Sequence, residues 1–419
     1  MSQNSFFKRR IRLSEPFKKK VLVAMIAFYS LAAAVFIFGF GICQWVTGGQ
    51  SDEFLRYSEN HAFGKGINPF SVMDGVVIKE CAGTVPYNFI FYYLFHFSDS
   101  DINVAMSVAF CLYLIAICAS AVVIFKFAMK NTLRNARISL LLVLIFLGQF
   151  GVGACLGIGN YGIYTYFFIL VLAYTDFFKK HSVAGGIALG LGMAKPQTMT
   201  LFFVPLVLGK RYLLVAVSVF TVAVAYLCVC FAISVHPIEL FSDFSAQGIR
   251  ATNIMGHIYC GILGSVWEFF SGNPRTDLLG ISFIIFLAFA FVLSWRFGNM
   301  ENMYAYLIPA AISTIWTYSC TYNSTGIYIL WAVPIVLDFF AREKISIGRL
   351  LLYIGVLAVM VSYLPRKMLG LPNELFPFSE DLYRLFMVFA AFFIVAKRNT
   401  FITDYGKISG GGRKILQKV

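Results

Sequence analysis

The sequence predicts an all-α multi-span membrane protein, with about 10 transmembrane spans, one half-helix hairpin and extracytoplasmic loops that carry short helices. Three observations predict this class. Hydrophobic residues make up 59% of the 419 residues and charged residues only 13%, which is far from the composition of a soluble domain. Several apolar runs approach the roughly 20 residues that cross a bilayer. Lys and Arg gather in short clusters between those runs, as the positive-inside rule requires.

No long polar block interrupts the apolar runs, so we expect one membrane domain, 21–396, between a basic N-terminus, 1–20, and a basic tail, 397–419. The Lys and Arg residues of both ends predict that they lie in the cytoplasm. The net charge of +14 is therefore a matter of membrane orientation, and nucleic acid is not an expected partner. The first apolar run, 21–46, is too long for a signal peptide and has no small-residue cleavage site, so it predicts an uncleaved span.

The charge clusters set the expected path of the chain. The main external loops are 48–102, 236–277 and 365–381, and the second should hold a short helix at 256–270. The aromatic segment 86–97 is too short to span the bilayer and is expected at the outer interface. The expected outward spans are 21–46, 138–158, 212–235, 304–318 and 350–364, and the inward spans are 103–129, 162–178, 278–296, 325–340 and 382–396.

The run 183–208 breaks this regular pattern. Charge of the cytoplasmic type flanks both of its ends, at 179–180 and 210–211, yet about 26 residues are too few for two full crossings. Pro196 also disfavours a continuous helix. We therefore expect two half-length helices that enter and return, with Lys195 at the apex. Small residues that permit close helix packing occupy four positions: Gly185, Gly186, Gly190 and Gly192.

The segment 48–87 carries much of the densest polar chemistry of the chain. Asp52 and Glu53 begin it, close to a membrane edge where a charge is costly unless it is solvated or used; a solvated loop acid is the ordinary alternative. The pair Asp99 and Asp101 has the Asp-x-Asp spacing of a metal site, but it precedes an apolar helix, so helix capping is favoured. The nine Cys residues form no CxxC pair, and no metal site is expected.

The central stretch resembles glycosyltransferase family 87, whose members have the GT-C fold and depend on polyprenyl-phosphate sugars. The turn 159–161 (GNY), the segment 184–197 (AGGIALGLGMAKPQ) and the basic pair 210–211 are similar to the Asn-containing turn, Lys-Pro segment and basic pair of that family. Earlier, an acid, a Tyr and a Gly-x-x-Pro-like turn also resemble it, at Asp52, Tyr57, Gly66 and Pro69. The resemblance covers residues 50–212. The chain departs from it at 319–323, where relatives often carry His.

The resemblance implies that Asp52 is the general base, because an acid in the first external loop is the hallmark of GT-C enzymes. Such a base removes the proton of an acceptor hydroxyl as its oxygen attacks the anomeric carbon; Glu53 is the first alternative. The lipid phosphate that leaves needs cations or hydrogen-bond donors. Residues expected to bind the donor phosphate are Lys195, Arg250 and His257. Residues expected to bind the acceptor or sugar are Arg56, Tyr57, Glu59, Asn160, Asn253 and Tyr322.

The expected function is transfer of a hexosyl residue, glucose or mannose, from a polyprenyl-phosphate donor to a lipid-linked or cell-surface glycan such as an O-antigen of lipopolysaccharide. No cofactor is expected besides the donor substrate, and the expected partners are membrane lipids, the lipid-linked sugar and the glycan acceptor. The expected location is the bacterial inner membrane, with the N-terminus cytoplasmic and the site periplasmic.

Two other functions compete with this one. A lipid-linked polysaccharide transporter or flippase usually has interrupted helices in both halves of the chain, whereas 183–208 is the one interrupted segment here. An O-antigen polymerase-like enzyme tends to have a large Arg-rich late external loop, whereas 365–381 is short. Both comparisons favour the transferase.

Overall fold

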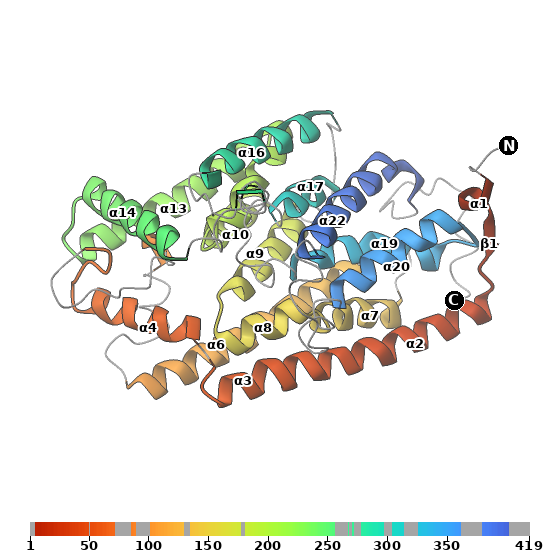
Figure 1. Cartoon of the computed structure of the whole chain (residues 1–419), viewed down its shortest axis with the longest axis horizontal. Coiled ribbons are helices and arrows are strands. Elements are labelled where there is room, and N and C mark those ends of the chain that lie inside the picture. Colours follow the sequence, from red (N-terminus) through yellow and green to blue (C-terminus); the bar gives the residue numbers. More distant parts are fainter. Residues whose placement is uncertain are drawn as a thin grey trace.

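The computed structural model describes residues 5–49, 51–71, 85–88, 101–129, 135–176, 181–255, 267, 270–271, 278–296, 304–313, 326–361 and 379–401. Helices dominate these residues (Figure 1). In the first half they are α1 Ser5–Lys8, α2 Glu15–Ala33, η1 Ala34–Ile42, α3 Cys43–Val46, α4 Ser51–Gly64, η2 Pro86–Asn88, α6 Ile102–Met129, α7 Ala136–Leu147, α8 Phe150–Ile158, α9 Gly162–Tyr174, α10 Ser182–Gly192, α11 Pro196–Met199, η4 Thr200–Phe202 and α12 Phe203–Leu208. In the second half they are α13 Tyr212–Ala232, α14 Pro237–Met255, α16 Leu278–Arg296, α17 Tyr304–Ser313, η6 Gly326–Tyr328, α19 Ile329–Ala341, α20 Ile347–Val361, α22 Ser379–Ala396 and η8 Arg398–Thr400.

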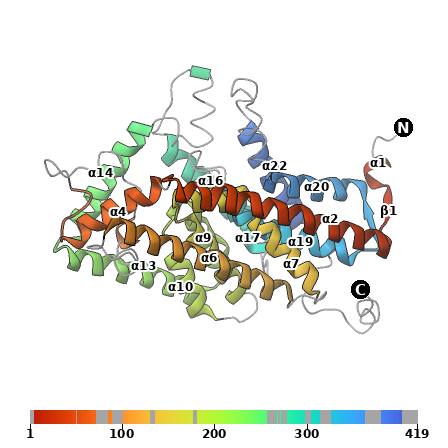
Figure 2. The ribbon, with the colours of Figure 1, turned by 90° about the horizontal axis from the view of Figure 1, so that it is seen from below.

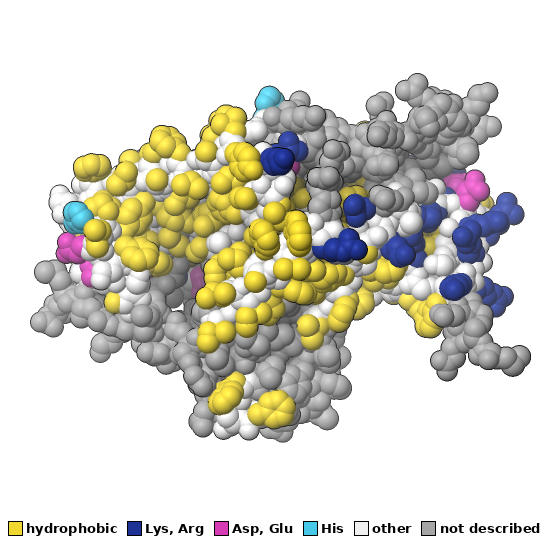
Figure 3. All heavy atoms as spheres, turned by 90° about the horizontal axis from the view of Figure 1, so that it is seen from above, with side chains coloured by type: hydrophobic (Ala, Val, Ile, Leu, Met, Phe, Trp, Pro, Cys, Tyr) yellow, Lys and Arg dark blue, Asp and Glu magenta, His cyan; other side chains and the backbone are white. Residues whose placement is uncertain are grey.

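Three of the described helices are long and apolar enough to cross a membrane: Glu15–Val46, Ile102–Met129 and Tyr212–Ala232. A fourth span is possible if α7 and α8, which meet at a 49° bend, count as one. Further apolar helices of 10 to 17 residues surround them, and the space-filling view shows hydrophobic side chains over the middle of the molecule (Figure 3). The all-α membrane class is confirmed, while the count of about 10 spans stays a prediction.

A small antiparallel sheet was not predicted. Strand β1 (Arg10–Arg12) pairs with β2 (Lys344–Ser346), with Ile11 opposite Ile345. Each strand has three residues, too few for an alternating pattern, and the partners lie far apart in sequence, so no local signal marks them. The pairing ties the basic N-terminus to the basic turn after α19, and thus brings together two segments that charge alone had predicted on one side.

The first membrane helix joins the two ends of the molecule. It is continuous over 32 residues, or roughly 48 Å at 1.5 Å per residue. The β1–β2 sheet lies at its start and α4 lies at its end, and Figures 1 and 2 agree that these features occupy opposite ends. Since the hydrocarbon of a bilayer is about 30 Å thick, this helix is long enough to reach from one membrane face to the other.

The first two predicted external segments carry helices, as the sequence predicted for these loops in general, but at positions that it did not predict. The first begins with the 14-residue helix α4, and the second begins with the 19-residue helix α14. They also meet, because Asn68 Nδ2 donates to Asp243 Oδ2 at 2.7 Å. Most of the helix expected at 256–270, and most of 86–97 and 365–381, lies outside the described residues.

The half-helix hairpin is present. Helix α10 starts beside the start of α13, since a Cβ on Gly185 would lie 3.0 Å from Leu214, and a Cβ on Gly190 would lie 2.8 Å from Thr221 further along. The two helices therefore run parallel. Because α13 begins just after α12 ends, the segment from Lys195 to Leu208 must return to the level at which α10 began. These contacts confirm the predicted role of the glycines in close helix packing.

The acid before α6 is a helix cap, as the sequence favoured. Asp101 Oδ1 accepts from the backbone N of Asn103 at 2.7 Å. This contact satisfies one of the donors left open at a helix start. Its partner in the Asp-x-Asp pattern, Asp99, lies outside the described residues.

Candidate active site at the start of helix α4

Helix α4 turns a charged stripe toward the protein. Asp52, Arg56 and Glu59 are spaced by four and three residues, which places them on one helical face. Arg56 and Glu59 are buried and Asp52 is partly exposed, whereas Phe54, on the other side, is 52% exposed. An ordinary surface helix buries an apolar face, whereas the first three turns of α4 bury charged side chains. Buried charges are costly unless paired, so the stripe marks a candidate functional site.

Asp52 and Asn160, two of the predicted site residues, are in contact although they lie 108 positions apart in the sequence. Asn160 Nδ2 donates to Asp52 Oδ2 at 2.6 Å. The other end of the same amide is also held, because Asn160 Oδ1 accepts from the backbone N of Gly162 at 2.8 Å. The amide is thus fixed between the start of α9 and the carboxylate, and it orients Asp52 without neutralising its charge.

The turn between α8 and α9 is built to approach α4. Gly159 has a φ of +71°, a left-handed conformation that glycine adopts without steric cost. A Cβ at this position would lie 2.4 Å from the Cβ of Glu53. Helix α8 is itself pressed against the first membrane helix, since a Cβ on Gly153 would lie 2.2 Å from the carbonyl O of Phe36. Small residues on α8 thereby set the position of Asn160.

Glu53, the alternative base, occupies a different environment. It is 1% exposed, and the Tyr113 hydroxyl lies 2.7 Å from Glu53 Oε2 and 2.9 Å from the carbonyl O of Gly159. A carboxylate enclosed in this way has no open side toward an incoming acceptor. The structure therefore favours Asp52 over Glu53 as the acid that a substrate can reach.

Two cations of the site, Lys195 and Arg56, both lie against the ring of Tyr161. The Lys195 ammonium lies 5.3 Å and the Arg56 guanidinium 5.6 Å from its centroid, both within cation–π range. Arg56 also donates through Nη1 to both carboxylate oxygens of Glu59, at 2.8 and 2.7 Å. Its charge is therefore largely balanced within α4. Lys195 is 4% exposed and keeps its predicted place as a candidate for a phosphate contact.

Lys195 owes its position to the helix break. Its backbone has φ −122° and ψ 84°, an extended conformation of the kind that a following Pro196 favours. Met193, two residues before Lys195, is held by a residue outside the hairpin, because the Tyr87 hydroxyl donates to its carbonyl O. Burial, and then the neighbouring Tyr161, raise the pKa of Tyr87, which keeps that hydroxyl protonated as a donor.

Two residues of this region had not been predicted as site residues. Tyr161 belongs to the quoted turn but was not assigned a role, since a Tyr beside an apolar helix is ordinarily a packing residue. Asn60 is buried on α4, and neither its Nδ2 nor its Oδ1 has a hydrogen-bond partner among the described residues. An unsatisfied buried amide calls for an explanation. In the sequence, the one indication that Asn60 faces the protein is its position seven residues, or about two helical turns, after Glu53.

The remaining predicted site residues are placed less fully. Tyr57 is on α4 and stacks on His61, with ring centroids 5.9 Å apart. Arg250 and Asn253 lie on α14, but their side chains are outside the described set. His257 and Tyr322 lie outside the described residues altogether.

The described residues contain no group of three or more His, Cys, Asp or Glu side chains arranged to hold a metal. What they bring together is an orientated, partly exposed carboxylate, a buried ammonium and an ion pair. Such a set can accept a proton on one side and stabilise an anionic leaving group on the other. With helices long enough to cross a bilayer, these features define a helical membrane protein with a candidate catalytic site beyond the end of its first long apolar helix.

A comparison with models of protein families identifies the family of this chain. The model of glycosyltransferase family 87 matches residues 86–314, more than half of the 419 residues. The chain therefore belongs to glycosyltransferase family 87, and the resemblance predicted from the sequence is confirmed. The match includes Asn160 and Lys195, and it begins after Asp52. A comparison with curated proteins finds no match.

Proposed function

We propose that this family 87 glycosyltransferase moves a hexosyl residue, glucose or mannose, from a polyprenyl-phosphate donor to a lipid-linked or cell-surface glycan acceptor, with Asp52 as general base. The contact that supports the proposal most is the 2.6 Å hydrogen bond from Asn160 to Asp52, on a helix that follows a membrane span. A sugar carried on a lipid presents its phosphate at the membrane surface, which is the depth at which the span ends.

The proposed step is a direct displacement. The acceptor hydroxyl oxygen forms a bond to the anomeric carbon while the bond from that carbon to the phosphate oxygen breaks. Asp52 takes the hydroxyl proton, and the polyprenyl phosphate leaves with the bonding electron pair. Lys195 is the proposed cation for the developing phosphate charge, and Asn160 holds Asp52 in position without itself accepting the proton.

Other predicted contacts are proposed for the substrates. Tyr57 offers a stacked aromatic surface beside His61, and the buried amide of Asn60 offers a donor and an acceptor for a sugar hydroxyl. Arg56 and Glu59 are better suited to stabilise the site, because they form an ion pair with each other. Membrane lipids, the lipid-linked sugar and the glycan acceptor remain the proposed partners, with no cofactor.

The site is proposed to face the periplasm of a bacterial inner membrane, with the N-terminus in the cytoplasm. Support comes from charge: Lys and Arg side chains gather at the β1–β2 end, away from α4 (Figure 3). An impermeant thiol reagent, applied to intact cells, should label Lys65→Cys but not Lys344→Cys in a cysteine-free background. Labelling of Lys344→Cys alone would invert the orientation.

The proposed reaction is tested with purified protein and a panel of polyprenyl-phosphate sugars, by measuring release of the lipid phosphate in the presence of membrane glycans. Wild type should release it from one hexosyl donor. Asp52→Asn should lower the rate by about 10²- to 10⁴-fold, while Glu239→Gln, which alters an exposed acid on α14, should leave it unchanged. Full activity of Asp52→Asn together with loss in Glu53→Gln would transfer the role to Glu53.

A further inference from the structure

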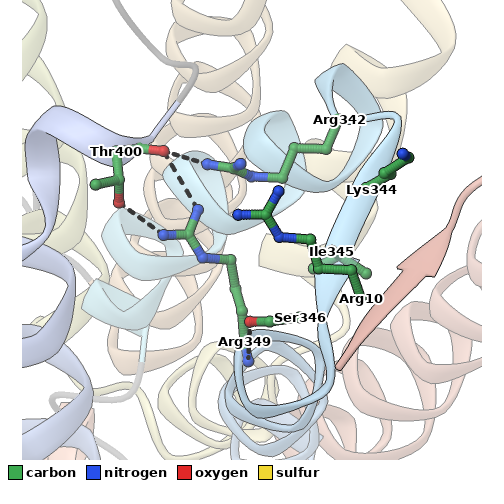
Figure 4. Close-up of a pocket in the computed structure, with 7 residues that line it drawn as sticks. All are labelled: Arg10, Arg342, Lys344, Ile345, Ser346, Arg349 and Thr400. Carbon is green, nitrogen blue, oxygen red and sulfur yellow. Dashed lines mark hydrogen bonds between the residues drawn. The ribbon is translucent and has the colours of Figure 1, made fainter. Parts of the chain in front are cut away.

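A cavity of about 290 Å³ lies at the end of the molecule opposite to Asp52. Seven residues line it: Arg10, Arg342, Lys344, Ile345, Ser346, Arg349 and Thr400. They come from β1, the turn after α19, β2, the start of α20 and the segment after α22. Figure 4 shows the guanidinium groups of Arg10, Arg342 and Arg349 directed toward one another across this space. Four of the seven residues are cationic.

One carboxylate partly balances these charges. Asp338, 0% exposed, accepts from Arg342 Nε at 2.6 Å and from Arg349 Nη1 at 3.1 Å. The two guanidinium groups also donate to Thr400, which holds them from the opposite side. Glu343 is exposed and does not line the cavity. Among the residues that the structure describes, these four cations thus share one buried acid, which leaves a surplus of positive charge on this part of the cavity wall.

The other two cations, Arg10 and Lys344, carry positive charge that a ligand could contact. No hydrogen bond or ion pair joins the side chains of Arg10 and Lys344 to the residues that the structure describes, although their backbones are fixed by the β1–β2 pairing. Helix α20 begins at the same place, and its N-terminus adds positive potential. Like charges held this close repel one another, so an anion that entered would relieve the repulsion and find donors already placed.

The surroundings indicate the depth of the cavity. Leu351 and Ile354, within two turns of Arg349 on α20, are exposed apolar side chains. Apolar side chains exposed beside a cationic cavity are typical of the boundary between lipid tails and head groups. The cavity volume is at the lower end of the range for ligand sites, which suits a head group rather than a whole lipid.

We propose that this cavity binds the phosphate group of an anionic membrane lipid, at the membrane face opposite to the transfer site. Arg342 and Arg349 form its fixed wall, and Arg10 and Lys344 close on the phosphate. The geometry also joins the N-terminal strand to the last helices, so a bound phosphate would hold the first and last parts of the chain together. The proposal does not depend on Asp52 or on the sugar donor.

Binding is measured on full-length protein in a neutral detergent, with dioctanoyl phosphatidylglycerol and inorganic phosphate as separate probes. The test variant is Arg10→Gln/Lys344→Gln. Its matched control is Lys19→Gln/Lys20→Gln, which removes the same charge from exposed residues of α2 at the same end. We expect the test variant to weaken binding by about tenfold or more, since charge-assisted hydrogen bonds are lost, and the control to change it by less than about threefold.

The two probes identify the source of the phosphate. Selective loss of phosphatidylglycerol binding supports the lipid head group, and selective loss of inorganic phosphate binding supports a soluble phosphate in its place. Equal loss in the test and control variants, or no loss in either, would overturn the site, because nonspecific surface charge would then explain binding. The single variant Lys344→Gln serves if the double variant melts at a lower temperature. Asp52→Asn should bind both probes as wild type does.

Discussion

The two ends of the molecule each contain an acid beside cations, but they treat it differently. Asp338 is fully buried and accepts from Arg342, Arg349 and the Tyr353 hydroxyl. Asp52 is partly exposed and accepts from one neutral amide. An acid enclosed by guanidinium groups and a hydroxyl has its oxygens occupied by structural contacts and serves the fold. An acid orientated by an amide, with one side open, retains the capacity to accept a proton.

The difference between the two ends is tested most directly by replacing the carboxylates of Asp338 and Asp52 one at a time. Asp338→Asn leaves two guanidinium groups without their acid, and loss of one partner from a buried ion pair costs about 3–5 kcal/mol. We expect a large fall in melting temperature, with transfer activity retained per folded molecule. Asp52→Asn should show the opposite, a loss of activity with little change in melting.

The measurement is thermal unfolding in detergent alongside the rate of lipid-phosphate release. If Asp338→Asn melted like wild type but transferred no sugar, the division between a structural end and a reactive end would be wrong.

A smaller effect is expected from the cation of the transfer site. Lys195→Gln removes the ammonium that lies over Tyr161, and loss of one stabilising group for a developing charge typically lowers kcat by about 10²- to 10³-fold. Lys195→Arg should recover part of this rate because it restores the charge. The check is steady-state kinetics with the identified donor; an unchanged kcat in Lys195→Gln would remove Lys195 from the leaving-group role.

The smallest effect should come from the residue that positions Asp52. Asn160→Ala removes the hydrogen bond to the carboxylate, and a bond to a charged group is worth about 1.5–3 kcal/mol, or roughly 10- to 150-fold in rate. The measurement is kcat alongside the melting temperature. A lower kcat at an unchanged melting temperature supports positioning of Asp52, whereas a lower melting temperature with an unchanged kcat would assign the hydrogen bond to the fold alone.

Much of the framework was readable from local pattern. Hydropathy predicted α16 at its observed limits, and α6 and α13 within a few residues. Pro196 and the flanking charges predicted the hairpin, and the acids and cations of the site were each identified by residue type. What local pattern could not show was which of them meet across the chain: Asp52 and Asn160 lie 108 positions apart and share a hydrogen bond. It also missed the β1–β2 sheet, which depends on residues far apart in sequence.

Membrane class, charge asymmetry and the break at Lys195 followed from the sequence alone, because hydropathy, charge and proline geometry act over a few neighbouring residues. The approach of Asn160 to Asp52, and of four cations to one cavity, was decided only by the tertiary structure. Those contacts depend on how helices cross, and the crossing is set by small residues such as Gly153 and Gly159 against side chains more than a hundred positions away. Such complementarity is a property of two surfaces in contact, and neither stretch of sequence contains it by itself.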